Sequence, residues 1–386
     1  MDFDSEAWDL VDHHCHGLSR AELDGAQVGA LLTESDYPPP QGTSFFEGQL
    51  GFAVRRWCAP LLDLPEHAEE EEYLRRRAQW GGRRVAQTLI RAAGLSVLCV
   101  DDGFPASELL TVEELGALSG LPARRVVRLE AVAEEVAVSG VAPEDFAAAF
   151  AERLAAQCAD QAVVGLKSVI GYRDGLDFQP SAPTGPEVRT AAADWLAQCA
   201  EDPSGLVSLR CPILLRHLVY GGAGYGAEHG LPLQFHTGLG DTSLHLGRVN
   251  PVHLTAFIRQ VRAQGTQVVL LHCYPYHREA AYLAHAYPHV WVDVGLSLHY
   301  VGAAAARVLG ETLELAPFTK TLFSTDAYGL PELYLLGSLL FRRAMGTVCD
   351  AFTASGYWSM RDAERVARMV AGGNARRLYP RLAGSA

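Results

Sequence analysis

Short hydrophobic runs recur along the chain, and most are separated by stretches whose apolar residues follow helical spacing. The runs are rich in Val, Ile and Leu at successive positions, which is typical of parallel strands buried on both faces. Strand and helix alternate eight times, and this pattern predicts a closed parallel (β/α)8 barrel of the α/β class. The predicted strands lie near residues 8–12, 96–101, 125–130, 162–168, 232–236, 267–272, 290–294 and 321–325.

Two connections between predicted strands are longer than a loop and one helix require. The first spans about 17–95, after strand 1, and the second about 169–231, after strand 4, where two helices are expected. Segments that follow barrel strands stand over the catalytic face, so both are candidate helical insertions for a lid or substrate pocket. The alternative, that they only extend the scaffold, stays open. With no repeat or linker in the sequence, we expect a single domain over 1–386.

Composition narrows the class of protein. The 386 residues are 49% hydrophobic and 20% charged, which is typical of a soluble globular protein. A formal charge of -13 disfavours nucleic acid or an anionic membrane as a partner. The acidic start, Met1–Glu6, resembles no signal peptide, and no run is long enough to span a membrane, so we expect a cytoplasmic protein. The eight cysteines form no CxxC pair and are expected to be free thiols.

Polar residues with metal-binding chemistry stand where apolar runs end. His14 and His16 share one run, and residues two apart on a strand point to the same face, so both imidazoles can reach one ion. Since the ends of barrel strands converge at the catalytic mouth, we expect these residues to meet there. The other members of the set are Lys167, His236, His272 and Asp326.

Imidazole and carboxylate groups suit zinc, with manganese or iron as alternatives. Asp326 could touch both the metal and a water molecule, and so act as ligand and general base together. The structural alternative for Asp326 is the N-cap of a helix expected at 331–346. Asp12 precedes the histidine pair and is expected to orient a ligand.

Lys167 has two interpretations. A neutral lysine at a buried strand end can form a carbamate that bridges two metals, whereas a cationic one can pair with a substrate carboxylate. One or two ions are therefore expected. Tyr172 and Arg173 follow the same strand and could bind a substrate carboxylate; the alternative for Arg173 is an ion pair with Asp174 or Asp177.

In the segments that carry these candidate residues, the chain resembles the amidohydrolase superfamily. The resemblance is to the amidohydrolase-related branch that includes the N-terminal domain of FluG-type and nodulin-like glutamine-synthetase fusions. No glutamine-synthetase portion is present in this sequence. The matching segments are Val11–His16, Gly165–Arg173, Leu233–Asp241, Leu270–Tyr276, Phe323–Asp326 and Gly373–Tyr379.

The resemblance implies a TIM-like metallo-dependent hydrolase barrel and an enzyme that binds one or two divalent metals. By position, His14, His16, His236 and Asp326 look like metal ligands and His272 like the further strand-end histidine. The implied reaction is hydrolysis of an amide bond in a small carboxylate-bearing substrate, with a γ-glutamyl amide as one candidate. Relatives in this branch also carry out non-oxidative decarboxylation, so a decarboxylase or lyase is the alternative.

The first hypothesis assigns Asp326 to proton transfer, His272 to oxyanion stabilisation, and Lys167 or Arg173 to a substrate carboxylate. Besides the hydrolase and the decarboxylase, a third hypothesis is a non-catalytic scaffold that kept the fold. The complete set of ligand-type residues disfavours this third hypothesis. A homo-oligomer is expected of many such barrels, but no sequence feature identifies an interface.

Overall fold

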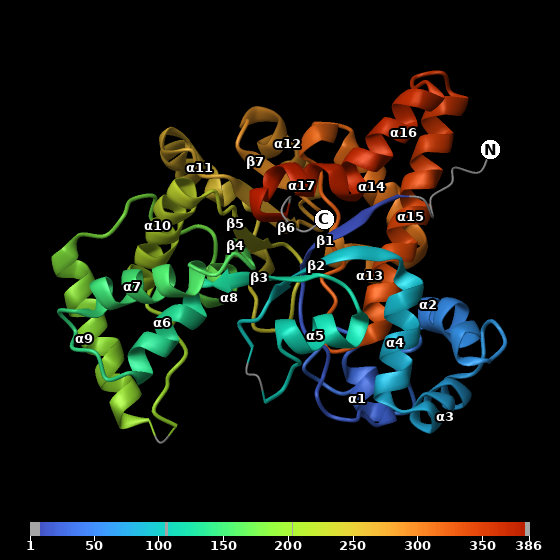
Figure 1. The fold of residues 1–386 in the computed structure, drawn as a ribbon, viewed down its shortest axis with the longest axis horizontal. Coiled ribbons are helices and arrows are strands. Elements are labelled where there is room, and N and C mark those ends of the chain that lie inside the picture. Colours follow the sequence, from blue (N-terminus) through green and yellow to red (C-terminus); the bar gives the residue numbers. More distant parts are fainter. Residues whose placement is uncertain (1–7, 105–106, 203, 383–386) are drawn as a thin grey trace.

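The computed structural model describes residues 8–104, 107–202 and 204–382; the acidic segment Met1–Glu6 and the ends of the domain expected over 1–386 fall outside these ranges. Within them, parallel strands pair in sequence order in one curled sheet (Figure 1). This order is expected when helix-containing crossovers join neighbouring strands. The strands are β1 Leu10–Cys15, β2 Leu95–Asp101, β3 Ala123–Arg128, β4 Val163–Ser168, β5 Leu233–Thr237, β6 Val268–His272 and β7 Val290–Val292.

The strands form where apolar residues are buried on both faces. Every residue of β1, β4, β5, β6 and β7 is buried. Seven of the predicted runs overlap these strands, so the expectation of a parallel sheet is confirmed. The polar residues near the strand ends are buried as well, which makes their hydrogen-bond partners the main question.

The segment predicted as the eighth strand, near 321–325, is not a regular strand. Thr321 forms one isolated parallel bridge to β7. Further along, the Asp12 side chain in β1 accepts hydrogen bonds from the backbone N–H and the hydroxyl of Thr325, at 2.9 and 2.5 Å. The Asp12 side chain thus takes the place of a strand carbonyl at Thr325 and interrupts the ladder. Backbone hydrogen bonds still join this segment to Val292 of β7 and to His13 and His14 of β1. The described sheet is an open, curled one of seven strands, which is consistent with a TIM-like barrel but lacks the expected eighth strand.

Helices cover the sheet in two groups (Figure 1). The helices of the 17–95 connection lie with the long helix α15, and α6, α7, α9 and α10 pack together on the opposite side. The 169–231 connection holds the two expected long helices and the one-turn α8. The helices are α1 Gly25–Ala30, α2 Gln49–Ala53, α3 Glu70–Trp80, α4 Gly82–Ala93, α5 Val112–Ser119, α6 Leu129–Val138, α7 Phe146–Cys158, α8 Ile170–Arg173, α9 Gly185–Glu201, α10 Pro212–His229, α11 Thr255–Val261, α12 His277–Ala286, α13 Gly295–Val301, α14 Ala305–Leu313, α15 Pro331–Ala354, α16 Met360–Arg368 and α17 Asn374–Leu378.

The core has three parts. Two large clusters fill the space between the sheet and the two groups of helices. A third cluster combines residues of six strands, such as Val11 and Val164, with Leu378 and Tyr379 from the end of the chain. The C-terminal segment thus closes one end of the curled sheet, and the polar strand ends lie at the other. All eight cysteines are free, and Cys15 and Cys273 pack in the two large clusters. In the described ranges, no helix is long and apolar enough to cross a membrane.

Candidate active site

The histidine pair meets the late aspartate at the end of β1. Nε2 of His14 lies 3.2 Å from Oδ1 of Asp326, and Nε2 of His16 lies 3.3 Å from the same oxygen. The pairing of β1 with β2 shifts register between Asp12 and Cys15, so the pair is not carried by an ideal strand. The two imidazoles nevertheless face one carboxylate oxygen, the geometry expected from their spacing.

His272 approaches the same carboxylate from the other side. Its Nε2 lies 3.5 Å from Oδ2 of Asp326. Both residues have left-handed backbones, with φ of 68° at His272 and 50° at Asp326, which non-glycine residues rarely adopt. Such conformations cluster at functional sites, where the surrounding structure holds them. Helix α15 begins at Pro331 with Leu330 as its N-cap, so the alternative role of Asp326 as that cap is wrong.

His236 lies beside His272 at the end of β5. Their ring centroids are 4.7 Å apart, and the ring of Tyr172 lies 4.4 Å from that of His236. Gly240 makes this arrangement possible, because a Cβ there would lie 2.2 Å from the Tyr172 hydroxyl and 3.0 Å from Nε2 of His236. The turn after β5 therefore packs directly on both side chains.

Lys167 lies near the end of β4, beside His14. Its Nζ lies 3.2 Å from Nε2 of His14, and the side chain is buried. Burial lowers the pKa of Lys167 to about 8, although the charges of Asp101 and Asp326 oppose this shift. Near neutral pH the lysine is therefore mainly cationic with a smaller neutral fraction, so both interpretations of this lysine stay open.

The electrostatics favour neutral imidazoles around an ionised carboxylate. Burial lowers the pKa of His14 to about 3 and that of His272 to about 4, and it lowers the pKa of His236 well below its ordinary value. Burial alone would raise the pKa of Asp326, but His272 and His14 hold it well below the usual range. These are the protonation states in which imidazole and carboxylate bind metals.

A hydrogen-bond network fixes which nitrogen of His14 carries a proton. Nδ1 of His14 lies 2.9 Å from Oε1 of Gln234. The Gln234 amide nitrogen donates to the His13 carbonyl at 3.1 Å and to the Tyr379 hydroxyl oxygen at 2.9 Å. Because the amide nitrogen is used in this way, Oε1 must face His14 and accept from Nδ1–H. Nε2 of His14 then presents its lone pair to the site.

The same network fixes His13 below the site. The Tyr379 hydroxyl accepts from Gln234, so its own hydrogen is free to donate to Nδ1 of His13, 3.0 Å away. Nε2 of His13 then donates to Asp293 at 2.7 Å. Asp293 also accepts from the backbone N–H of His272 at 2.5 Å. This carboxylate therefore connects the network to a second histidine of the site.

Asp12 acts on Asp326 rather than on a histidine. Its carboxylate holds the backbone and hydroxyl of Thr325, the residue immediately before Asp326. The backbone N–H of Asp326 donates to the His14 carbonyl at 3.0 Å. Asp12 thus orients the segment that carries Asp326.

Tyr172 and Arg173 both line the pocket above these residues. The guanidinium of Arg173 lies 3.4 Å from Glu134. The expected alternative partners, Asp174 and Asp177, are instead paired with Arg248, at 3.7 and 2.7 Å. The pairing of Arg173 with Asp174 or Asp177, expected from the sequence, was wrong. The two aspartates lie in a turn that faces the loop around Arg248 and not the Arg173 side chain of α8.

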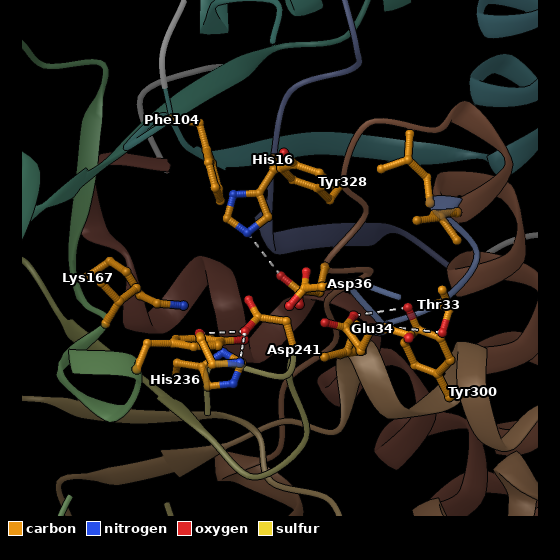
Figure 2. A pocket seen from close by; sticks show the side chains of 18 of the residues that line it. His16, Thr33, Glu34, Asp36, Phe104, Lys167, His236, Asp241, Tyr300 and Tyr328 are labelled. Atoms are coloured by element: carbon orange, nitrogen blue, oxygen red, sulfur yellow. Dashed lines mark hydrogen bonds and ion pairs between the residues drawn. The ribbon is translucent and has the colours of Figure 1, made fainter. Parts of the chain in front are cut away.

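The pocket has a volume of about 450 Å³, which suits a small molecule. Figure 2 shows Lys167 and His236 on one side, His16 above, and Glu34 with Tyr300 on the other. Sequence reasoning missed several of its residues. The strand-end rule could have found Arg128, which lines the pocket from the end of β3, and Asp101 at the end of β2, which does not line the pocket but forms a buried ion pair with Arg128 at 2.7 Å. Loop residues such as Glu34 carry no comparable pattern.

The residues present fit a divalent metal. Two groups place their ligand atoms within 4.8 Å of one another: His14 with His272 and Asp326, and His14 with His16 and Asp101. In the described part of the chain, Nε2 of His236, both ring nitrogens of His272 and Oδ1 of Asp326 are buried without a hydrogen-bond partner. Each such atom costs about 1–3 kcal/mol, a cost that an ion would offset. Asp101 is the least suitable ligand, because Arg128 already neutralises it.

A family model described as amidohydrolase matches residues 111–381. The chain belongs to the amidohydrolase family. The amidohydrolase is 30% identical over 396 aligned residues to the protein fluG of Emericella nidulans, an alignment that covers 96% of this chain. It spans only 45% of the length of that relative.

Solved structures support the same assignment. A protein of Lactobacillus casei, provisionally described as a metal-dependent hydrolase, matches the amidohydrolase with a TM-score of 0.85 and 25% identity, over 99% of this chain and 98% of that one. A uronate isomerase of Thermotoga maritima matches with a TM-score of 0.63 over 97% of this chain and 95% of that one. At 13% identity, this second likeness shows the fold alone. The chain is therefore an enzyme of the amidohydrolase superfamily.

Proposed function

We propose that this enzyme hydrolyses an amide C–N bond in a small substrate that carries a carboxylate, with a γ-glutamyl amide as the leading candidate. The observation that carries the proposal is the convergence of three imidazoles on the two oxygens of Asp326, with Lys167 beside them. Such a site can hold a cation and still leave a carboxylate to move protons.

The ligand set we propose is His14, His16, His236 and Asp326, with zinc as the expected metal and manganese or iron as alternatives. The two geometric groups around His14 support three members of this set, His14, His16 and Asp326, but they include His272 rather than His236. When bound, the ion supplies Lewis acidity that polarises a carbonyl and lowers the pKa of water. We leave one or two ions open at this point, because Lys167 suits either number.

Asp326 is the proposed proton carrier. As a new C–O bond forms between water and the substrate carbonyl, Asp326 takes one proton from the water and passes it to the leaving nitrogen as the C–N bond breaks. Its low pKa keeps it ready to accept that proton. His272, whose ring nitrogens have no other partner in the described ranges, is placed to stabilise the developing oxyanion.

The substrate carboxylate is proposed to face Lys167 and Arg173. Both line the pocket, as does Tyr172, whose ring packs against His236. Burial raises the pKa of Tyr172 well above its ordinary value, so the phenol stays neutral and can donate to an oxygen of the substrate. The cationic side chains of Lys167 and Arg173, together with the Tyr172 hydroxyl as a donor, suit a carboxylate.

The test is the isosteric variant Asp326→Asn, assayed with its metal content measured in parallel on a panel of γ-glutamyl and related amides. Because general acid–base catalysis contributes about 10²–10⁴-fold, we expect turnover to fall by at least about 10²-fold while the fold is unchanged. Incorporation of oxygen from labelled water into the product acid identifies hydrolysis. Release of carbon dioxide without that incorporation would instead establish the decarboxylase, and full activity of the variant would overturn the role of Asp326.

A further inference from the structure

The pocket above Asp326 is divided by charge. In Figure 2, Lys167 lies on one side, Glu34 with Tyr300 on the other, and Asp36 and Asp241 between them. The other basic residues of the pocket come from β3 and from the connection after β4, the strand that carries Lys167. The lining basic residues are Lys167, Arg128, Arg173 and Arg210, and the lining acidic residues besides Asp326 are Glu34, Asp36 and Asp241.

The acidic group has no protein cation as a partner. Within the described ranges, no Lys, Arg or His nitrogen lies within 4.0 Å of the carboxylates of Glu34, Asp36 or Asp241, whereas Arg128 and Arg173 each pair with an acidic side chain. Glu34 instead accepts a hydrogen bond from the Tyr300 hydroxyl at 3.0 Å. Its charge must therefore be met by solvent or by a ligand.

The position of Glu34 makes that charge costly. Burial and the nearby charges of Asp326 and Asp241 raise the pKa of Glu34 to about 7, against the opposing hydrogen bond from Tyr300. A cation placed between these carboxylates would relieve the repulsion. The phenol of Tyr300, whose pKa burial raises well above its ordinary value, stays neutral and completes a wall that suits an ammonium group, because cations are attracted to aromatic faces.

The arrangement favours an organic cation over a metal ion. Groups of at least three ligand atoms within 4.8 Å of one another occur at His14 in the described chain, and neither includes Glu34, Asp36 or Asp241. His236, a proposed metal ligand that is only 5% exposed, has its Nε2 beside the Gly240–Asp241 turn, so these acidic residues adjoin the proposed metal site. A substrate atom is thus expected next to the acidic wall.

We propose that the substrate is dipolar, an amino-acid derivative whose ammonium group binds Glu34 and Asp241 while its carboxylate faces Lys167 and Arg173. The inference rests on the proposed function and deepens it by naming the second charged group of the substrate. Glu34 is then a specificity-determining residue, and it selects amino-acid derivatives against acids of the same length without an amino group.

The test is isothermal titration of the metal-containing protein with L-glutamate and with glutarate, which lacks the amino group. Since one charge-assisted hydrogen bond contributes about 1.5–3 kcal/mol, L-glutamate should bind at least about tenfold more tightly. Glu34→Gln keeps the size of the side chain and its acceptor for Tyr300, and should remove the preference. Glu47→Gln, on an exposed residue of the same connection, should retain it. Asp241→Asn provides a second variant and should weaken the preference.

Equal affinity for the two probes, or no binding of L-glutamate, would overturn the inference. A preference that survives in both Glu34→Gln and Asp241→Asn would also overturn the assignment of the ammonium site. Failure of the proposed function looks different, because it is the absence of amide hydrolysis by a protein that binds metal. Selective binding of L-glutamate without hydrolysis would therefore support the ammonium site and reject the reaction.

Discussion

At the residue scale, an uncharged glutamine makes one of the most consequential contacts of the site. Gln234 is held by two donated hydrogen bonds, and its carbonyl therefore has to face His14. Groups that orient ligands in this way are worth about 10–100-fold in metal affinity in characterised sites. The Tyr379 hydroxyl is the part of this network that can be removed with the least change in volume.

Tyr379→Phe should therefore weaken metal binding by about 10–100-fold, because the Gln234 amide loses the acceptor that fixes its orientation. The measurement is a competitive metal titration of protein stripped with a chelator. Tyr357→Phe is a matched control, since that tyrosine is 86% exposed and is not part of this hydrogen-bond network. Unchanged affinity in Tyr379→Phe would show that the glutamine is held by other contacts.

Lys167 decides the number of metal ions. A bridged pair needs two complete ligand groups, but the second group around His14 includes Asp101, whose charge Arg128 already uses. We therefore expect about one equivalent of metal in the native protein and about one in Lys167→Ala, as for a mononuclear catalytic site. Two equivalents in the native protein, falling in the variant, would instead establish a carbamate bridge. Metal analysis of protein purified without chelator distinguishes these outcomes.

At the element scale, a buried ion pair joins the first long connection to α15. Nε of Arg77 in α3 lies 2.7 Å from Glu332 in α15, and the Tyr73 hydroxyl donates to the same carboxylate oxygen at 2.8 Å. Both charged side chains are almost completely buried. Helix α15 follows directly on the segment that carries Asp326. This contact therefore holds the first long connection, part of which lines the pocket, against the segment that carries Asp326.

Arg77→Ala should lower the free energy of unfolding by about 3–5 kcal/mol, because it leaves the Glu332 charge buried without a cation to balance it. Denaturant unfolding measures this change. Arg365→Ala is the control: its pair with Asp362 is mostly exposed, and exposed pairs contribute about 0–1 kcal/mol. Similar losses in the two variants would mean that water reaches Glu332 and relieves the burial.

Much of the architecture could be predicted from periodicity, because seven strands are apolar enough to be recognised one by one. The irregular form of the eighth run could not, since the bond from Asp12 to Thr325 that interrupts its ladder joins residues far apart in sequence. The same limit applies to the site. Strand-end residues such as His272 were predictable, whereas the place of Glu34 in the pocket depends on how the 17–95 connection folds back over the sheet.

At the scale of the whole molecule, the metal site is expected to contribute to stability as well as to catalysis. The residues that converge on Asp326 come from β1, β6 and the segment after β7, so one ion would connect distant parts of the sheet. Several of their polar atoms are buried without partners in the described chain. Metal bound only to the native state stabilises it by mass action, by about 4 kcal/mol at a thousandfold excess over Kd.

Removal of metal with a chelator should therefore lower the Tm by several degrees, and addition of zinc should restore it. Differential scanning calorimetry with and without the chelator checks this. The variant His14→Ala should show a reduced response to both treatments, because it lacks a proposed ligand. A Tm that does not respond in the native protein would mean that the metal contributes nothing to the global fold.

The contact between His13 and Tyr379 also has a consequence for biosynthesis. The two residues are 366 positions apart, so a ribosome makes the histidines of β1 at the beginning of this chain and their orienting tyrosine near its end. Until Tyr379 has emerged, Gln234 lacks one of the partners that turn its carbonyl toward His14. Metal capture by the oriented site is then expected to follow synthesis of the whole sheet, because a nascent chain with only the first strands exposed presents histidines whose tautomers are not yet fixed.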